Sequence, residues 1–186
     1  MRLATVVFLA LIAFTAGSRA DSIAVGAAQD RDVLQTIARE LCRNTKFGFK
    51  ILDRRVLSTD SRQKSVDVES NALRDLFARN GESEALPAGV GCSRLRAIDA
   101  AHIERAFNPP GLPERVPADW DRFLTEFPMA QGIVRMSLPG FSDDRKIAVV
   151  LVSVSRGYYG DVGVIWQLGL KKEGWLVEKT AYAWIT

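Results

Sequence analysis

The sequence predicts an α+β fold in which N-terminal amphipathic helices pack on a C-terminal four-stranded antiparallel β-meander. Apolar residues recur at helical spacing in the first two thirds of the chain, and β-rich runs joined by short polar turns follow from residue 133. The chain has 186 residues, of which 47% are apolar and 25% charged. This length and balance predict one globular domain, which we place at residues 21–186.

The first twenty residues have the three parts of a secretory signal peptide. Met1-Arg2 is positively charged, residues 3–14 are all apolar or small, and small residues occupy positions −3 and −1 before Asp21. The apolar run is shorter than the roughly 20 residues that a membrane-spanning helix needs. We therefore expect residues 1–20 to be removed and the mature protein to be exported, periplasmic or secreted, without a membrane span. An uncleaved anchor or a buried N-terminal helix is the alternative.

The first helix of the mature chain is expected to begin at an Asp30 or Asp32 cap. Its apolar face consists of Val33, Leu34, Ile37 and Leu41. A strand is expected over residues 47–52, with Phe47, Phe49 and Ile51 on one side, and the polar residues 53–66 predict a loop.

Further helices are expected in the middle of the chain. One has an apolar face that ends at the Asn80-Gly81 stop and consists of Val68, Ala72, Leu73, Leu76 and Phe77. A short strand around Leu95 and Ile98 precedes a helical turn that begins near Asp99. Trp120 begins a last short helix, which Pro128 ends.

Four β-rich runs follow, at residues 133–137, 147–154, 162–170 and 175–185. Residues 147–152 are apolar throughout, which indicates a central strand covered on both faces. The connections between the runs are short, as they are between antiparallel neighbours. These four runs are the strands of the expected meander.

Cys42 and Cys92 are the two cysteines of the chain. In an oxidising compartment, two cysteines fifty positions apart are candidates for a disulfide. Two unpaired core cysteines are the alternative, because Cys42 falls on a helix face where a small apolar side chain suffices. A nucleophilic cysteine activated by His102 is a third.

The C-terminal part contains short motifs in a characteristic order: Trp120 with Phe123, Phe127-Pro128, Ser137, Gly140-Phe141, Gly174-Trp175 and Trp184-Ile185-Thr186. This order resembles a family of uncharacterised exported bacterial proteins with the pattern W-x-x-F…Y-P…S-x-x-G-F…G-x-W…W-[IV]-S. The resemblance covers residues 118–186 and extends to Arg79-Asn80 and Leu86-Pro87. Phe127 replaces the family's tyrosine, Pro139 an aliphatic residue and Thr186 the final serine. The resemblance implies export and the fold, and it implies no activity and no site.

Charge and composition exclude several classes of function. The formal charge is +3, and removal of residues 1–20 takes away Arg2 and Arg19 and leaves +1. Nucleic-acid-binding proteins normally keep a strong basic excess, so we expect no nucleic-acid partner. One histidine and two cysteines exclude most zinc sites, and we expect neither a metal nor a cofactor.

The residues able to carry chemistry each have a structural alternative. His102 is a candidate general base or a surface residue, and Ser137 lacks the G-x-S-x-G context of a nucleophile. The paired carboxylates of Asp119 with Asp121 and of Asp143 with Asp144 are candidates for acid–base hydrolysis. Helix capping by Asp119 and turn formation by the second pair are the alternatives.

The loop at residues 156–163 is the candidate binding site. It contains Arg156, Tyr158, Tyr159 and Asp161 among three glycines, and tyrosine and arginine are enriched at binding hot spots. The alternative is a glycine-rich hairpin whose tyrosines pack on the sheet. We thus hypothesise a non-enzymatic exported module that binds an unknown protein or cell-envelope component. The competing hypothesis is a small hydrolase of envelope glycan or peptide, with Asp119, Asp121 or Asp144 as acid and base.

Overall fold

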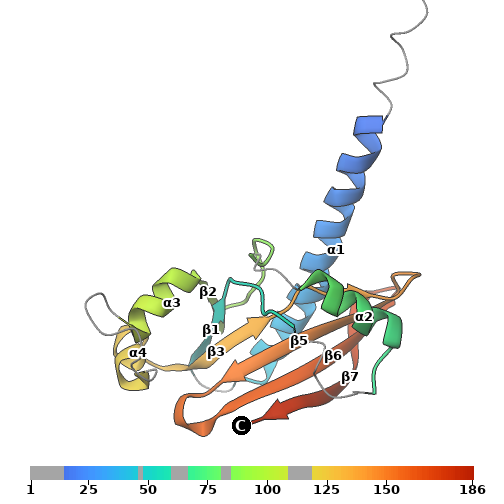
Figure 1. Cartoon of the computed structure of the whole chain (residues 1–186). Coiled ribbons are helices and arrows are strands. Elements are labelled where there is room, and N and C mark those ends of the chain that lie inside the picture. The colour runs from blue at the N-terminus through green and yellow to red at the C-terminus, as the bar shows by residue number, and fades with distance from the viewer. Residues whose placement is uncertain (1–14, 46–47, 60–66, 81–84, 109–118) are drawn as a thin grey trace, which may run out of the picture.

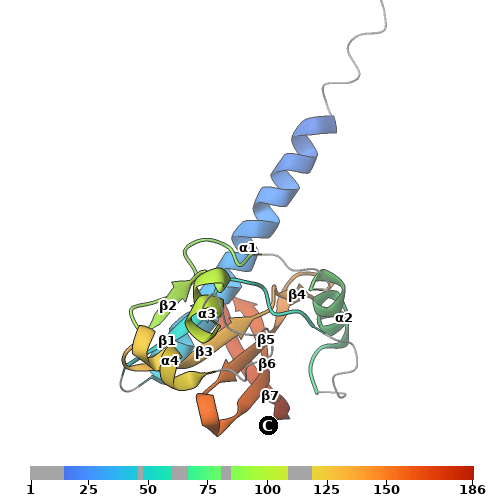
Figure 2. The ribbon, with the colours of Figure 1, turned by 60° about the vertical axis from the view of Figure 1, so that its left-hand side comes forward.

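A mixed β-sheet forms the middle layer of the protein, with one helix on one face and three on the other (Figures 1 and 2). The computed structural model describes residues 15–45, 48–59, 67–80, 85–108 and 119–186. The helices are α1 (Thr15–Arg43), α2 (Ser70–Arg79), α3 (Ala100–Phe107), α4 (Trp120–Glu126) and the 3-10 turn η1 (Gly157–Tyr159). The strands are β1 (Phe49–Asp53), β2 (Leu95–Ile98), β3 (Ala130–Met136), β4 (Gly140–Phe141), β5 (Ile147–Ser155), β6 (Asp161–Lys171) and β7 (Gly174–Ile185).

The predicted four-stranded antiparallel meander under N-terminal helices is wrong. The sheet has seven strands in the order β2-β1-β3-β5-β6-β7, with β4 beside β5. Strand β1 runs parallel to both β2 and β3, while β3, β5, β6 and β7 pair antiparallel in chain order. Parallel neighbours need a long crossover, and helices α2, α3 and α4 lie in these crossovers instead of preceding the sheet.

Helix α1 differs from the expected helix at its start. It begins at Thr15, not at an Asp30 or Asp32 cap, and its N-terminal part projects away from the sheet (Figure 1). Asp30 lies inside the helix, where its carboxylate accepts a hydrogen bond of 2.7 Å from Nη2 of Arg79. Side chains that pack α1 on the sheet include Val33, Leu34, Ile37 and Ala38, all fully buried. The apolar run at residues 3–14 lies outside the described residues, and no helix of the described part is long and apolar enough to cross a membrane.

The two faces of the central strands are covered by different helices. On one face, Val150 of β5 and Leu52 of β1 pack with α1. On the other face, Val149 and Leu151 pack with α2, and Ile51 packs with α3 and α4. Strand β5 is thus buried on both faces, which confirms the interpretation of its apolar sequence.

The expected ends of the three shorter helices are confirmed. Helix α2 ends at Asn80, and Asp99 precedes α3. Asp119 caps α4 by accepting a 3.0 Å hydrogen bond from the backbone N–H of Arg122. Gly81, Phe47 and residues 60–66 of the expected loop lie outside the described residues.

Cys42 and Cys92 are joined in a disulfide, with their Cα atoms 6.6 Å apart. The structure therefore supports the disulfide, and not a pair of free core cysteines or a nucleophilic cysteine. The bond ties the last turn of α1 to the segment that leads into β2. On the loop-entropy model, closing a loop of this length stabilises the folded state by roughly 4 kcal/mol.

The end of α2 is held to the segment between β3 and β5 by buried polar contacts. The side chain of Asn80 donates to the carbonyls of Leu76 at 2.8 Å and Leu138 at 3.0 Å, and accepts from the N–H of Leu138 at 2.6 Å. Gly140 lies so close to α2 that a Cβ there would overlap the backbone of Leu76 and Ala72. Only glycine allows this approach, and Figure 2 shows α2 beside β4.

Gly140→Ala should destabilise the protein by about 3 kcal/mol, because α2 or β4 has to move to admit one methyl group. The matched control is Gly26→Ala in α1, where a Cβ would meet no atom within 4 Å. That control should stabilise by about 0.5–1 kcal/mol through helix propensity. Urea unfolding followed by circular dichroism measures both, and a Gly140→Ala protein as stable as wild type would contradict the close approach.

Candidate functional site

A cavity of about 550 Å³ opens at the end of the sheet where β1 and β3 begin and β5 ends. It lies between the last residues of α1, helix α4 and the turn η1. Its described lining consists of Asn44, Lys50, Trp120, Leu124, Ala130, Gln131, Gly132, Arg156, Gly157 and Tyr159. The volume is within the usual range of small-ligand sites. Below we call it the sheet-end cavity.

Lys50 supplies a buried positive charge to the sheet-end cavity. Its side chain comes from β1, is only 8% exposed and donates a 2.6 Å hydrogen bond from Nζ to Oγ1 of Thr45. Burial, and then the positive charge of Arg156, lower the pKa of Lys50 below its ordinary value of 10.5. No carboxylate of the described residues offsets this effect. The ammonium group therefore destabilises the folded protein in the absence of a counter-charge.

Trp120 forms a rigid aromatic wall of the same cavity. Its ring meets Phe107 edge-on at 5.0 Å and Phe123 at 5.1 Å between ring centroids. On its other side, Gly157 has a φ of +69°, and a Cβ there would lie 3.3 Å from Cδ2 of the indole. The turn therefore packs directly on Trp120, and the indole is held in place before any ligand binds.

The turn η1 brings two of the four predicted binding residues to the cavity. Arg156 and Tyr159 line it, and Tyr159 is 90% exposed. Asp161 does not line it, since its carboxylate accepts a 2.8 Å hydrogen bond from Ser153 and its backbone pairs with Thr186. The side chain of Tyr158 is outside the described part of the structure.

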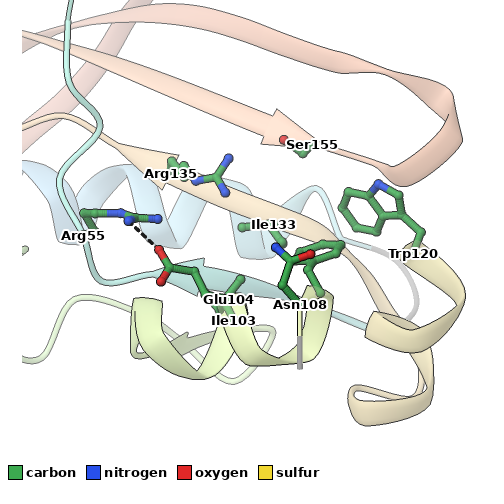
Figure 3. Close-up of a pocket in the computed structure, with 9 residues that line it drawn as sticks. Arg55, Ile103, Glu104, Asn108, Trp120, Ile133, Arg135 and Ser155 are labelled. Atoms are coloured by element: carbon green, nitrogen blue, oxygen red, sulfur yellow. Dashed lines mark hydrogen bonds and ion pairs between the residues drawn. The ribbon is translucent and has the colours of Figure 1, made fainter. Parts of the chain in front are cut away.

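A second cavity, of about 260 Å³, also has Trp120 in its lining (Figure 3). Figure 3 shows Arg55 and Glu104 pointing toward each other, at 2.7 Å between Nη1 and Oε1. The pKa of Arg55 is raised, chiefly by this hydrogen bond to Glu104. Arg55 and Arg135 also contact the fully buried carboxylate of Asp53, at 3.5 Å and 3.2 Å. The cations of this cavity are therefore already paired, unlike those of the sheet-end cavity.

His102 and Ser137, the lone histidine and the considered serine nucleophile, make structural contacts. Nε2 of His102 lies 3.0 Å from Oε1 of Glu126 and so links α3 to α4. The buried Ser137 hydroxyl accepts a 2.9 Å hydrogen bond from the N–H of Leu151, as the strand-end alternative predicts. Within the described residues, no group of three or more His, Cys, Asp or Glu side chains is placed to hold a metal.

The candidate acid–base carboxylates lie at opposite ends of β5. Asp119 and Asp121 are on α4, near Ser155 at the end of the strand, while Asp144 precedes its start. A nine-residue strand is about 30 Å long, far more than the separation of two carboxylates acting on one bond. Asp144 accepts hydrogen bonds from Ser142 and the N–H of Lys146, and the first of these chiefly lowers its pKa.

No family model, curated protein or solved structure matches the chain. The family resemblance described above therefore stays a prediction. The structure does show what several of the residues that carry it do. Asn80, Ser137 and Gly140 hold the segment between β3 and β5 in place, whereas Trp120 lies at the sheet-end cavity.

Lys50→Met should raise the melting temperature at about pH 7, because it removes a buried ammonium group and keeps the aliphatic length. The lowered pKa means that the unfolded chain binds this proton more tightly than the folded protein does. Wild-type stability therefore rises with pH toward 10.5, where the unfolded lysine also loses its proton. The advantage of the variant should shrink at about pH 10. Scanning calorimetry at both pH values measures this, and a difference independent of pH would contradict a charged, buried Lys50.

Proposed function

We propose that the protein is an exported, non-enzymatic binding module that recognises a protein or another cell-envelope component at the sheet-end cavity. One observation carries this proposal. A buried lysine without a counter-charge among the described residues and a pre-positioned tryptophan line the same cavity. An unpaired buried charge destabilises a protein, so a stabilising partner for it is the simplest reason to keep it.

The rim of the cavity has the composition of a contact surface. Tyr159 is 90% exposed, Leu124 is 42% exposed, and both line the cavity together with Arg156. Aromatic residues and arginine supply most of the energy in typical interfaces. An exposed tyrosine and leucine next to a cavity therefore favour a ligand that extends beyond the cavity onto its rim.

The geometry does not favour the hydrolase alternative. Asp119 and Asp121 are remote from Asp144. None of these three carboxylates is in the described lining of the sheet-end cavity. Asp75 and Asp143 do share another cavity, of about 460 Å³. Both hold the fold there, Asp75 by accepting from the N–H of Phe141 at 2.8 Å and Asp143 from the amide of Asn71 at 3.1 Å.

Export is supported by the pattern of residues 1–20 and by the disulfide, which is typical of oxidising compartments. The fold is compatible with cleavage before Asp21, because the described buried side chains of α1 begin at Asp30. The packed part of α1 would thus remain in the mature protein.

Mass spectrometry of the native chain should therefore find a mature form that begins at or within a few residues of Asp21. The form should occur in the periplasmic or culture fraction, with Cys42 and Cys92 oxidised. Substituting Ala20 with a bulky residue should slow the cleavage, since the −1 position requires a small side chain. An intact Met1 on protein confined to the cytoplasm would contradict export.

Tyr159→Ala should abolish capture of a partner from envelope fractions without unfolding the protein, because the side chain is almost fully exposed. Tyr182→Ala is the matched control, since Tyr182 is 71% exposed on β7 and does not line the cavity. The experiment compares cross-linked captures by the wild type and the two variants. Equal capture by the wild type and Tyr159→Ala would show that the partner does not bind at the rim of the sheet-end cavity. Equal loss of capture in Tyr159→Ala and Tyr182→Ala would show that the loss is not specific to this rim.

A further inference from the structure

We propose that the sheet-end cavity binds a phosphate monoester, with the phosphate between Lys50 and Arg156 and the attached group against Trp120. This inference rests on the proposed function, because it names the chemistry of the ligand at the same cavity.

Lys50 is largely buried and lines the cavity. Its ammonium group is in a side chain more than nine-tenths buried, and its one described hydrogen bond is to the neutral hydroxyl of Thr45. An ammonium group has three donors, so two remain for a ligand. Burial removes part of the hydration of Lys50, so a ligand anion in the cavity would offset a desolvation cost that the fold already carries.

Lys50 and Arg156 line the cavity together, with no acidic residue in its described lining. Arg156 is close enough to Lys50 to disfavour its charged form. The described lining contains no carboxylate, while the neighbouring cavity holds Arg55 and Arg135 against Asp53 and Glu104. The cations of the second cavity are neutralised by carboxylates, whereas those of the sheet-end cavity have no carboxylate in its described lining. An anion is therefore expected to bind in the sheet-end cavity.

The charge of a phosphate monoester fits two neighbouring cations. A phosphate monoester carries nearly two negative charges near neutral pH, which matches one lysine and one arginine. Lysine binds phosphate as a point charge, and arginine binds it through a fork of parallel donors. A carboxylate would neutralise only one of the two cations.

The cavity also has room beside Trp120 for the group attached to the phosphate. Trp120 is fixed by Phe107, Phe123 and Gly157, and it offers a flat apolar wall to the same space. Inorganic phosphate would fill a small part of about 550 Å³ and leave this wall unused. A phosphate attached to a ring or another flat apolar group would use both features.

The test uses phenyl phosphate, benzoate and phenol as probes that share a ring and differ in charge. Binding to the full chain is followed by NMR through the indole N–H of Trp120, which is assigned from its loss in Trp120→Phe. We expect phenyl phosphate to shift this signal with saturation. Benzoate should bind at least about threefold more weakly, and phenol should not saturate.

Lys50→Met and Arg156→Gln should each weaken phenyl phosphate binding by about tenfold or more, the effect of one charge-assisted hydrogen bond. Lys172→Met is the control for loss of a positive charge, since Lys172 is exposed in the turn between β6 and β7. It should leave binding within about twofold of wild type. Retention of the other three indole signals shows that each variant is folded.

Equal binding of phenyl phosphate and benzoate, unchanged binding in Lys50→Met, or saturation by phenol would each overturn the proposal. These outcomes are separable from failure of the proposed function. If Tyr159→Ala abolishes partner capture but no anionic probe binds, the module stands and the phosphate chemistry fails. If phenyl phosphate binds through Lys50 but Tyr159→Ala captures its partners normally, the phosphate site stands and the proposed recognition surface fails.

Discussion

Asn80 is completely buried, and two of its three side-chain hydrogen bonds join the end of α2 to Leu138, in the segment between β3 and β5. Much of the architecture depends on this contact, because α2 belongs to the crossover between the parallel strands β1 and β2, while the bonded segment belongs to the antiparallel half. A buried amide without these partners would cost more than an average hydrogen bond contributes. The close approach at Gly140 then fixes how near α2 lies to β4. Helix α2 is therefore held against the antiparallel half of the sheet by one polar side chain and by the absence of another side chain.

Local patterns predicted the elements of this fold better than their arrangement. The apolar spacing of α2 and the β-rich runs near the C-terminus led to correct elements, since these signals are local. The parallel pairing of β1 with β3 left no such signal. Ile51 pairs with Ile133, 82 positions later, and periodicity shows that each belongs to a strand without showing that they are neighbours. The expected cap at Asp30 failed for a related reason, because its carboxylate is used by the distant Arg79.

The lining residues of the sheet-end cavity were likewise predicted where the signal was local and missed where it depended on the tertiary fold. Contact-rich residues in the turn after β5 indicated Arg156 and Tyr159, and both line the cavity. Lys50 was missed, although it is a charged residue between Phe49 and Ile51 on a strand that the alternation predicted. Its importance depends on the burial of both faces of β1, which follows only from the tertiary fold. Trp120 is both a core residue, as its aromatic neighbours indicate, and a cavity wall, whereas the sequence indicated only that it begins a short helix.

The long separation between β1 and β3 has a consequence for the order of folding. Strands β5 and β6 pair across a short turn, so they close a small loop, whereas β1 has to wait for a partner synthesised much later. We expect the antiparallel strands to assemble early, and the N-terminal third of the chain to join them in a slower step. Lys50 lies on β1 and Arg156 follows β5, so the two cations come together only in that step. Their mutual repulsion then opposes the last stage of folding, and a ligand that neutralises them would accelerate it if the transition state already contains the β1–β3 pair.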